Sequence, residues 1–170
     1  MVRALVLAAL LASLAGPAAA AVGLAASVEE LAGEADAVLR GRVAARASRW
    51  TAGGRRLVTE VVLVVNERWR GEAPARVVLL VPGGERDGVG QRVDGAPAFE
   101  EGEEVVVFLR RLPGGSFRVH GMAQGKFRVE GGEARPDLRQ VRLLAGEGRA
   151  GSRRVEAMPL HELARRVRAP

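Results

Sequence analysis

Residues Leu57–Val65 read Leu-Val-Thr-Glu-Val-Val-Leu-Val-Val, and this stretch decides the fold class. Six of its nine residues are β-branched, and only Thr59 and Glu60 are polar. Branched side chains lose little freedom when they are held extended on a pleated surface, so the stretch predicts a long strand. Its second half is apolar on both faces, which favours a central strand of a closed or stacked sheet with cover on each side.

Similar apolar runs, separated by glycine and proline turns, predict further strands around this one. They are expected over residues 38–47, 56–67, 76–81, 104–111, 116–121 and 126–130, with another short strand within 138–144. The apolar run at 77–81 again predicts cover on both faces. Gly41, in the middle of the first strand, indicates a bulge, a bend or a close backbone approach. The predicted class is mainly β: five to seven strands, mainly antiparallel, in a small barrel or sandwich.

A helix is expected at each end of this β domain. Ser27 and Glu30 have the spacing of a capping box, which predicts a short helix from Val28 to about Ala35. Pro159 followed by apolar residues at helical spacing predicts a C-terminal amphipathic helix within about 154–168.

The N-terminus has the layout of a secretory signal peptide over residues 1–21. Arg3 precedes an uncharged run of eleven residues, shorter than the ~20 that span a bilayer, and small residues then allow cleavage near Ala20 or Ala21. An uncleaved anchor stays open as an alternative, because no charge occurs between Arg3 and Glu29. We therefore expect a single domain over residues 22–170 in a secreted or periplasmic bacterial protein.

Composition limits the chemistry and the partners. The chain has no cysteine, which excludes disulfides, thiolate catalysis and cysteine zinc sites. Its net charge is +6, and Lys126 is its only lysine among 26 basic residues. A basic exported protein favours anionic lipids, polysaccharides or acidic proteins, so the expected partner is an unknown protein, a peptide or an anionic envelope ligand. Nucleic acid is not an expected partner, and membrane contact is expected only through the signal peptide.

Several short motifs follow one another along the chain: Glu34–Val38, Gly41–Val43, Val61–Val65, Arg70–Gly71, Phe99 with Gly102-Glu103, and Val105–Leu109. In this order they resemble the OB-like barrel of netrin-like and TIMP-like domains, and more closely the cysteine-free exported bacterial proteins that share it. The resemblance covers roughly residues 28–129 and implies a small OB-like antiparallel barrel of five to seven strands that serves as a binding scaffold, without catalytic residues. TIMP-type inhibition through an N-terminal cysteine cannot be carried over to a chain without cysteine.

Residues 82–97 form the candidate binding loop. This segment holds five glycines, two prolines and five charged residues, and loops of such length in a compact domain are usually functional or disordered. Gln124 and Lys126, in the connection between two later strands, are candidate neighbouring contacts. The candidate loop residues are Gly83, Gly84, Glu85, Arg86, Asp87, Gly90, Gln91, Arg92 and Asp94.

No catalytic, cofactor-binding or metal-binding residue is predicted. His120 and His161 lie forty-one residues apart, and the acidic run around Gly102 lacks the spacing of a calcium loop. No serine stands in a nucleophile elbow. The leading hypothesis is an exported, non-enzymatic binding or accessory module without a cofactor. The alternatives are a protease inhibitor or protease-associated protein, and a hydrolase that uses Glu103 and Asp94.

Overall fold

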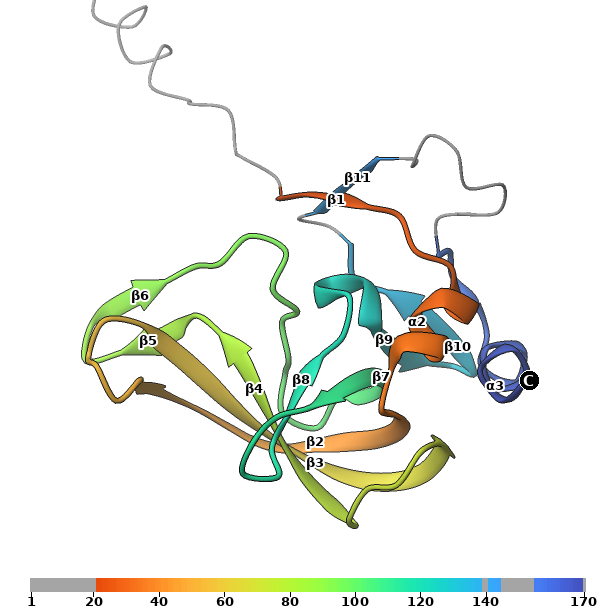
Figure 1. The fold of residues 1–170 in the computed structure, drawn as a ribbon, viewed down its shortest axis with the longest axis horizontal. Coiled ribbons are helices and arrows are strands. Elements are labelled where there is room, and N and C mark those ends of the chain that lie inside the picture. Colours follow the sequence, from red (N-terminus) through yellow and green to blue (C-terminus); the bar gives the residue numbers. More distant parts are fainter. Residues whose placement is uncertain (1–20, 139–140, 145–154, 170) are drawn as a thin grey trace, which may run out of the picture.

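A computed structural model describes residues 21–138, 141–144 and 155–169. Of the predicted signal peptide, residues 1–20 lie outside the described part of the chain. The predicted fold class is confirmed: the chain forms a closed five-stranded barrel with one short helix near the N-terminus and one at the C-terminus (Figure 1). Among the described residues, no helix is long and apolar enough to cross a membrane.

Five strands close the barrel. They are β2 (Ala37–Trp50), β3 (Leu57–Arg70), β4 (Arg76–Pro82), β7 (Glu104–Arg111) and β8 (Phe117–Val119). Neighbouring strands are antiparallel except β4 and β8, which are parallel, so the barrel is mixed rather than wholly antiparallel. Around the barrel the order is β2, β3, β4, β8, β7 and back to β2. Numbered along the chain, this is first, second, third, fifth and fourth, which is the Greek-key order of an OB barrel.

Shorter elements extend this barrel. Beyond β7 the sheet continues through β9 (Lys126–Glu130), β10 (Glu133–Pro136) and β12 (Met158–Pro159). A hairpin of β5 (Gly84–Arg86) and β6 (Val89–Gln91) lies within the candidate binding loop, and the 3-10 helix η1 (Met122–Gly125) precedes β9. The strand predicted within 138–144 is confirmed as β11 (Val141–Leu144), which pairs in parallel with β1 (Ala21–Leu24).

Both helices pack on one side of the barrel, in a second core with residues of β2, β3, β7, β9 and β10 (Figure 1). The predicted capping box is present at the start of α2 (Val28–Glu34). The C-terminal helix α3 (Leu160–Arg168) begins at Leu160 with Pro159 as its N-cap. It starts later than the predicted start at about residue 154, because residues 158–159 pair with β10. Alternate residues of β7 therefore face two cores: Val105 and Val107 point into the barrel, and Val106 and Phe108 point toward the helices.

The predicted double cover of β3 and β4 is wrong. Val61 and Leu63 are buried in the barrel, but Val62 and Val64 on the opposite face are only half-buried. On β4 the outward Val78 is 36% exposed. The C-terminal helix covers β3 only near Trp69, so no helix among the described residues packs on the outer face of the β3–β4 pair at Val62, Val64 and Val78.

Gly41 confirms the predicted irregularity. The register between β2 and β3 shifts between Arg40 and Gly41, as in a β-bulge. A Cβ at Gly41 would lie 2.3 Å from the carbonyl oxygen of Val64, so the neighbouring backbone also approaches too closely for any side chain.

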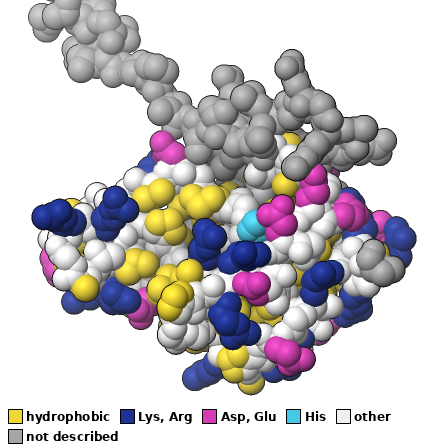
Figure 2. Space-filling view, viewed as in Figure 1, with side chains coloured by type: hydrophobic (Ala, Val, Ile, Leu, Met, Phe, Trp, Pro, Cys, Tyr) yellow, Lys and Arg dark blue, Asp and Glu magenta, His cyan; other side chains and the backbone are white. Residues whose placement is uncertain are grey.

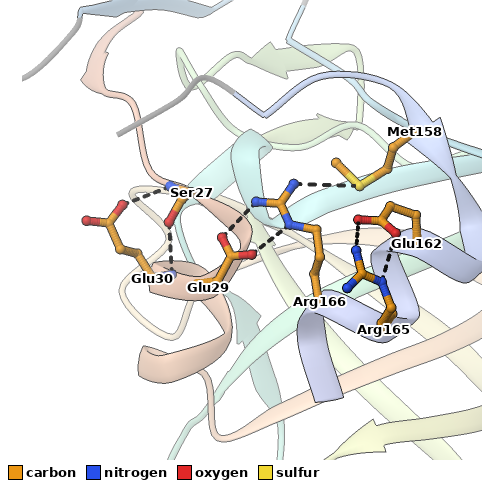
Figure 3. A network of polar contacts seen from close by, with 7 residues as sticks. All are labelled: Ser27, Glu29, Glu30, Met158, Glu162, Arg165 and Arg166. Carbon is orange, nitrogen blue, oxygen red and sulfur yellow. Dashed lines mark hydrogen bonds and ion pairs between the residues drawn. The ribbon is translucent and has the colours of Figure 1, made fainter. Parts of the chain in front are cut away.

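An ion pair joins the two helices (Figure 3). The guanidinium of Arg166 in α3 donates to both carboxylate oxygens of Glu29 in α2, at 2.6 and 2.7 Å. These hydrogen bonds lower the pKa of Glu29 below its ordinary value of 4.5. When folding lowers the pKa of a carboxyl group, the ion pair stabilises the protein fully at a pH above the pKa of that group in the unfolded state. This stabilisation is lost as the pH falls through the lower pKa of the group in the folded state.

The Glu29→Gln variant is therefore expected to lose about 0.2–1 kcal/mol of unfolding free energy at pH 7, the range of exposed ion pairs. The difference from the parent protein should shrink as the pH falls from 4.5 through the lowered pKa of Glu29 in the folded protein, since the parent's carboxyl becomes protonated over that range. Urea denaturation at several pH values measures this. Glu72→Gln is the control, because the exposed Glu72 carboxylate has no ion pair with any residue in the described ranges. A difference that does not depend on pH would contradict the assignment.

Candidate functional site

The barrel is incomplete where β4 meets β8. These strands pair at one position, Leu79 with Phe117, so β4 has no strand partner on that side from Leu80 to Pro82 in the part of the chain that the structure describes. A groove of about 300 Å³ lies beside this gap. We call it the seam groove, and its lining residues are Thr51, Arg56, Leu57, Val58, Leu80, Val81, Pro82, Pro97, Leu112, Arg118, Val119 and Met122.

The seam groove is mainly apolar. Hydrophobic side chains gather on this face over the region where Figure 1 places β4 and β8 (Figure 2). Leu80 and Val58 come from the uncovered outer faces of β4 and β3, and both are half-buried. Met122, at the first residue of η1, has a φ of 56° and is 39% exposed. The groove therefore exists because the outer face of this strand pair is left without a helix.

The charged residues of the seam groove are both cations. Arg56 lies at the start of β3 and Arg118 on β8, and both are exposed. Neither guanidinium has an ion pair with any residue that the structure describes. Within the described parts of the chain, no Asp, Glu, His or Ser lines the groove. The lining thus combines an apolar floor with a positive rim and holds no nucleophile beyond the Thr51 hydroxyl.

The candidate binding loop borders this groove through Pro82 and Pro97, but its base is structural. The backbone amide of Leu57 donates to Gln91 Oε1 at 2.6 Å, and Thr59 Oγ1 donates to the carbonyl of Gly83 at 2.8 Å. Gly83 is buried, and Gly84 and Gln91 are half-buried. The predicted residues that are exposed to solvent are Glu85, Arg86, Asp87, Gly90, Arg92 and Asp94.

The 121–126 connection lies beside the loop, as the sequence suggested, because the amide of Ala123 donates to the carbonyl of Gly95 at 3.0 Å. The two predicted contact residues in it are buried. Gln124 Oε1 accepts from the amide of Ala26 at 3.0 Å. Lys126 is 0% exposed. These two side chains make contacts inside the fold next to the site and are not exposed to a ligand.

Lys126 is held by the segment that enters β7. Its ammonium forms an ion pair with Glu103, donates to the carbonyl of Ala98 and lies 4.6 Å from the centroid of the Phe99 ring. Burial lowers the pKa of Lys126, and the hydrogen bond and charge of Glu103 oppose that shift. The Glu103 side chain is itself only 4% exposed, and its Oε2 accepts from the amide of Glu100 at 2.8 Å. The pair fixes the loop between residues 98 and 103 against β9.

A second groove, of about 310 Å³, lies on the acidic run. Glu100, Glu103 and Glu104 line it together with Arg42 and Arg128, which compensate much of the charge. Asp94 does not line this groove, so the structure does not bring together the two carboxylates of the hydrolase hypothesis.

The histidines form no joint site. His120 is half-buried, and its Nε2 lies 3.3 Å from Oε2 of Glu34. Burial lowers the pKa of His120. His161 is exposed on α3. No group of three metal-ligating side chains occurs within residues 21–138, 141–144 and 155–169.

No protein-family model, curated protein or solved structure matches the chain. The resemblance to netrin-like and TIMP-like domains therefore stays a prediction, and the argument on function depends on the geometry of the fold.

The sequence did not indicate four residues that shape the seam groove: Arg56, Leu80, Arg118 and Met122. For Leu80 the sequence pattern could have shown this, because Leu80 lies between Leu79 and Val81 on β4 and points to the opposite face from these two buried residues. The others come from separate segments, and only the closure of the barrel brings these segments together.

Proposed function

We propose that this protein is an exported, non-enzymatic binding module whose contact surface is the seam groove with the exposed tip of the 82–97 loop beside it. The observation that supports this most is the lining itself, an apolar floor with two unpaired arginines at its rim and no catalytic constellation. Such a lining can bind and orient a partner but, among the described residues, offers no carboxylate or histidine for acid–base catalysis.

The position of the groove in the barrel supports the same function. OB barrels bind their ligands over the second and third strands, next to the loops that follow the first and fourth strands. In this chain those strands are β3 and β4, and the two loops contribute Thr51 and Leu112 to the groove. The lining residues thus occupy the ligand position typical of the fold.

The volume favours a macromolecular partner. About 300 Å³ is at the lower limit of pockets that enclose small molecules. It is enough for one or two side chains of a larger ligand, while the loop tip, where Val89 is 47% exposed, supplies additional contact area. We therefore expect a polypeptide partner that inserts an anchor into the groove and lies against the tip.

Photo-cross-linking in the native cell compartment tests this proposal without knowledge of the partner. A benzophenone amino acid placed at Met122, in the groove, and one placed at Val89, on the loop tip, should yield the same discrete adduct. The matched control is Arg135, which is exposed on β10 and lines no part of the groove. The adduct from Met122 should disappear when Leu80→Glu is added, because the charge removes the apolar floor.

Equal labelling from Met122 and Arg135, or no adduct from either groove or tip, would overturn the proposal. Circular dichroism and thermal unfolding of the Leu80→Glu variant show whether it stays folded. If it does not, Arg118→Glu, at an exposed position on the rim, replaces it as the disrupting change.

A further inference from the structure

We propose that the partner segment in the seam groove is an extended acidic peptide, which places one apolar side chain on the groove floor and adjacent carboxylates on Arg56 and Arg118. This inference rests on the proposed function and specifies its ligand class.

The open edge of β4 favours an extended main chain. On one side β4 pairs with β3 from Arg76 through Pro82. On the other side β8 supplies only the Leu79–Phe117 bridge, so residues 80–82 adjoin the groove without a strand among the described residues. A peptide laid beside an unpaired sheet edge gains main-chain contacts, and pockets for its alternate side chains give specificity. Pro82 has no amide hydrogen, which restricts such contacts to a short segment.

The floor favours one apolar anchor. Leu80, Pro82 and Met122 present aliphatic and thioether groups to the groove. A methionine adapts its shape to different apolar partners, which suits a site that accepts more than one aliphatic side chain. A groove of about 300 Å³ has room for one such side chain and part of a neighbour.

The rim favours carboxylates next to that anchor. Many arginines elsewhere on the barrel, among them Arg40, Arg49 and Arg128, are already paired with glutamates. Arg56 and Arg118 have no ion pair with a described residue, and none of the described carboxylates lines the groove to neutralise them. Guanidinium groups bind carboxylates with two parallel hydrogen bonds, which are among the stronger polar contacts in water. A neutral or basic segment would leave both cations without a counter-charge.

A displayed library of random peptides, selected on the full-length protein, tests the inference. Enriched peptides should carry Leu, Ile, Val or Met flanked by Asp or Glu, and enrichment should fail on Leu80→Glu. A synthetic peptide of the enriched type, and its Gln-for-Glu counterpart, are then titrated by calorimetry. Arg56→Gln and Arg118→Gln should each weaken the acidic peptide about tenfold and leave the amide peptide almost unchanged. Arg76→Gln is the matched control, an exposed and unpaired arginine at the far end of β4.

The outcomes separate this inference from the proposed function. Groove-dependent enrichment of neutral or basic peptides would overturn the acidic specificity and keep the binding module. Absence of any enrichment that depends on Leu80 would count against both. Vesicles of phosphatidylglycerol provide the remaining arm: if they bind through Arg56 and Arg118 while no acidic peptide does, the ligand is an anionic surface and the inference fails.

Discussion

Lys126→Ala is expected to lower the free energy of unfolding by about 3–5 kcal/mol, the cost of removing one partner from a buried ion pair. The side chain is fully buried, and its ammonium contacts the Glu103 carboxylate, the Ala98 carbonyl and the Phe99 ring. Without the ammonium, the nearly buried carboxylate loses its closest counter-charge. The segment that connects the 82–97 loop to β7 should loosen as a result.

Urea denaturation of the variant and the parent protein measures this loss. Arg49→Ala is the matched control, because Arg49 also pairs with a glutamate but is 48% exposed, and its loss should stay within about 0–1 kcal/mol. The double variant Lys126→Met with Glu103→Gln should recover part of the stability, since it leaves no unpaired buried charge. A loss below about 1 kcal/mol for Lys126→Ala would show that the pair is not a structural anchor.

Gly125→Ala is expected to destabilise the protein by at least about 2 kcal/mol, because the new methyl group has no space. A Cβ at Gly125 would lie 1.8 Å from the carbonyl oxygen of His120, a backbone atom that cannot move without distorting the turn between β8 and β9. The turn also carries Met122, so the seam groove should change shape. Thermal unfolding, together with the chemical shifts of the groove amides, reports both effects.

Gly33→Ala is the matched control for this change. Gly33 lies in α2, where a Cβ would meet nothing within 4 Å. Alanine replaces the most flexible residue of that helix and should raise the free energy of unfolding by about 0.5–1 kcal/mol. The two substitutions add the same methyl group. A loss of unfolding free energy at Gly125 and a gain at Gly33 would therefore show that the effect comes from the lack of space around Gly125. A similar effect at both positions would refute the close packing of the η1 turn.

Local signals in the sequence predicted the barrel strands and the first helix well. The Ser27–Glu30 pair determines a helix start through hydrogen bonds that span three residues, and Gly41 marks a bulge because only glycine fits beside the next strand. Pairings between distant segments left no such signal. The parallel pair of β1 and β11 joins segments more than a hundred residues apart, and β10, which contains Pro136, lacks an apolar run.

The seam groove adjoins the predicted loop at Pro82 and Pro97, but the sequence did not predict its other lining residues. An apolar run such as Leu57–Val65 shows that both faces of a strand are hydrophobic, but it does not show whether a helix, a partner or solvent meets the second face. The helices cover β7, β9 and the end of β3 near Trp69, and the part of the β3–β4 face that they leave uncovered lines the groove through Val58 and Leu80. Lys126 looked like a surface contact because a lone lysine in a short connection is usually exposed.

The most direct test of the central claim, that the uncovered seam between β4 and β8 is a binding surface, is photo-cross-linking from Met122. The account predicts one discrete adduct from Met122, the same adduct from Val89, none from Arg135, and loss of the Met122 adduct in the folded Leu80→Glu variant. Adducts that form as readily from Arg135 as from Met122, or that persist in Leu80→Glu, would contradict it.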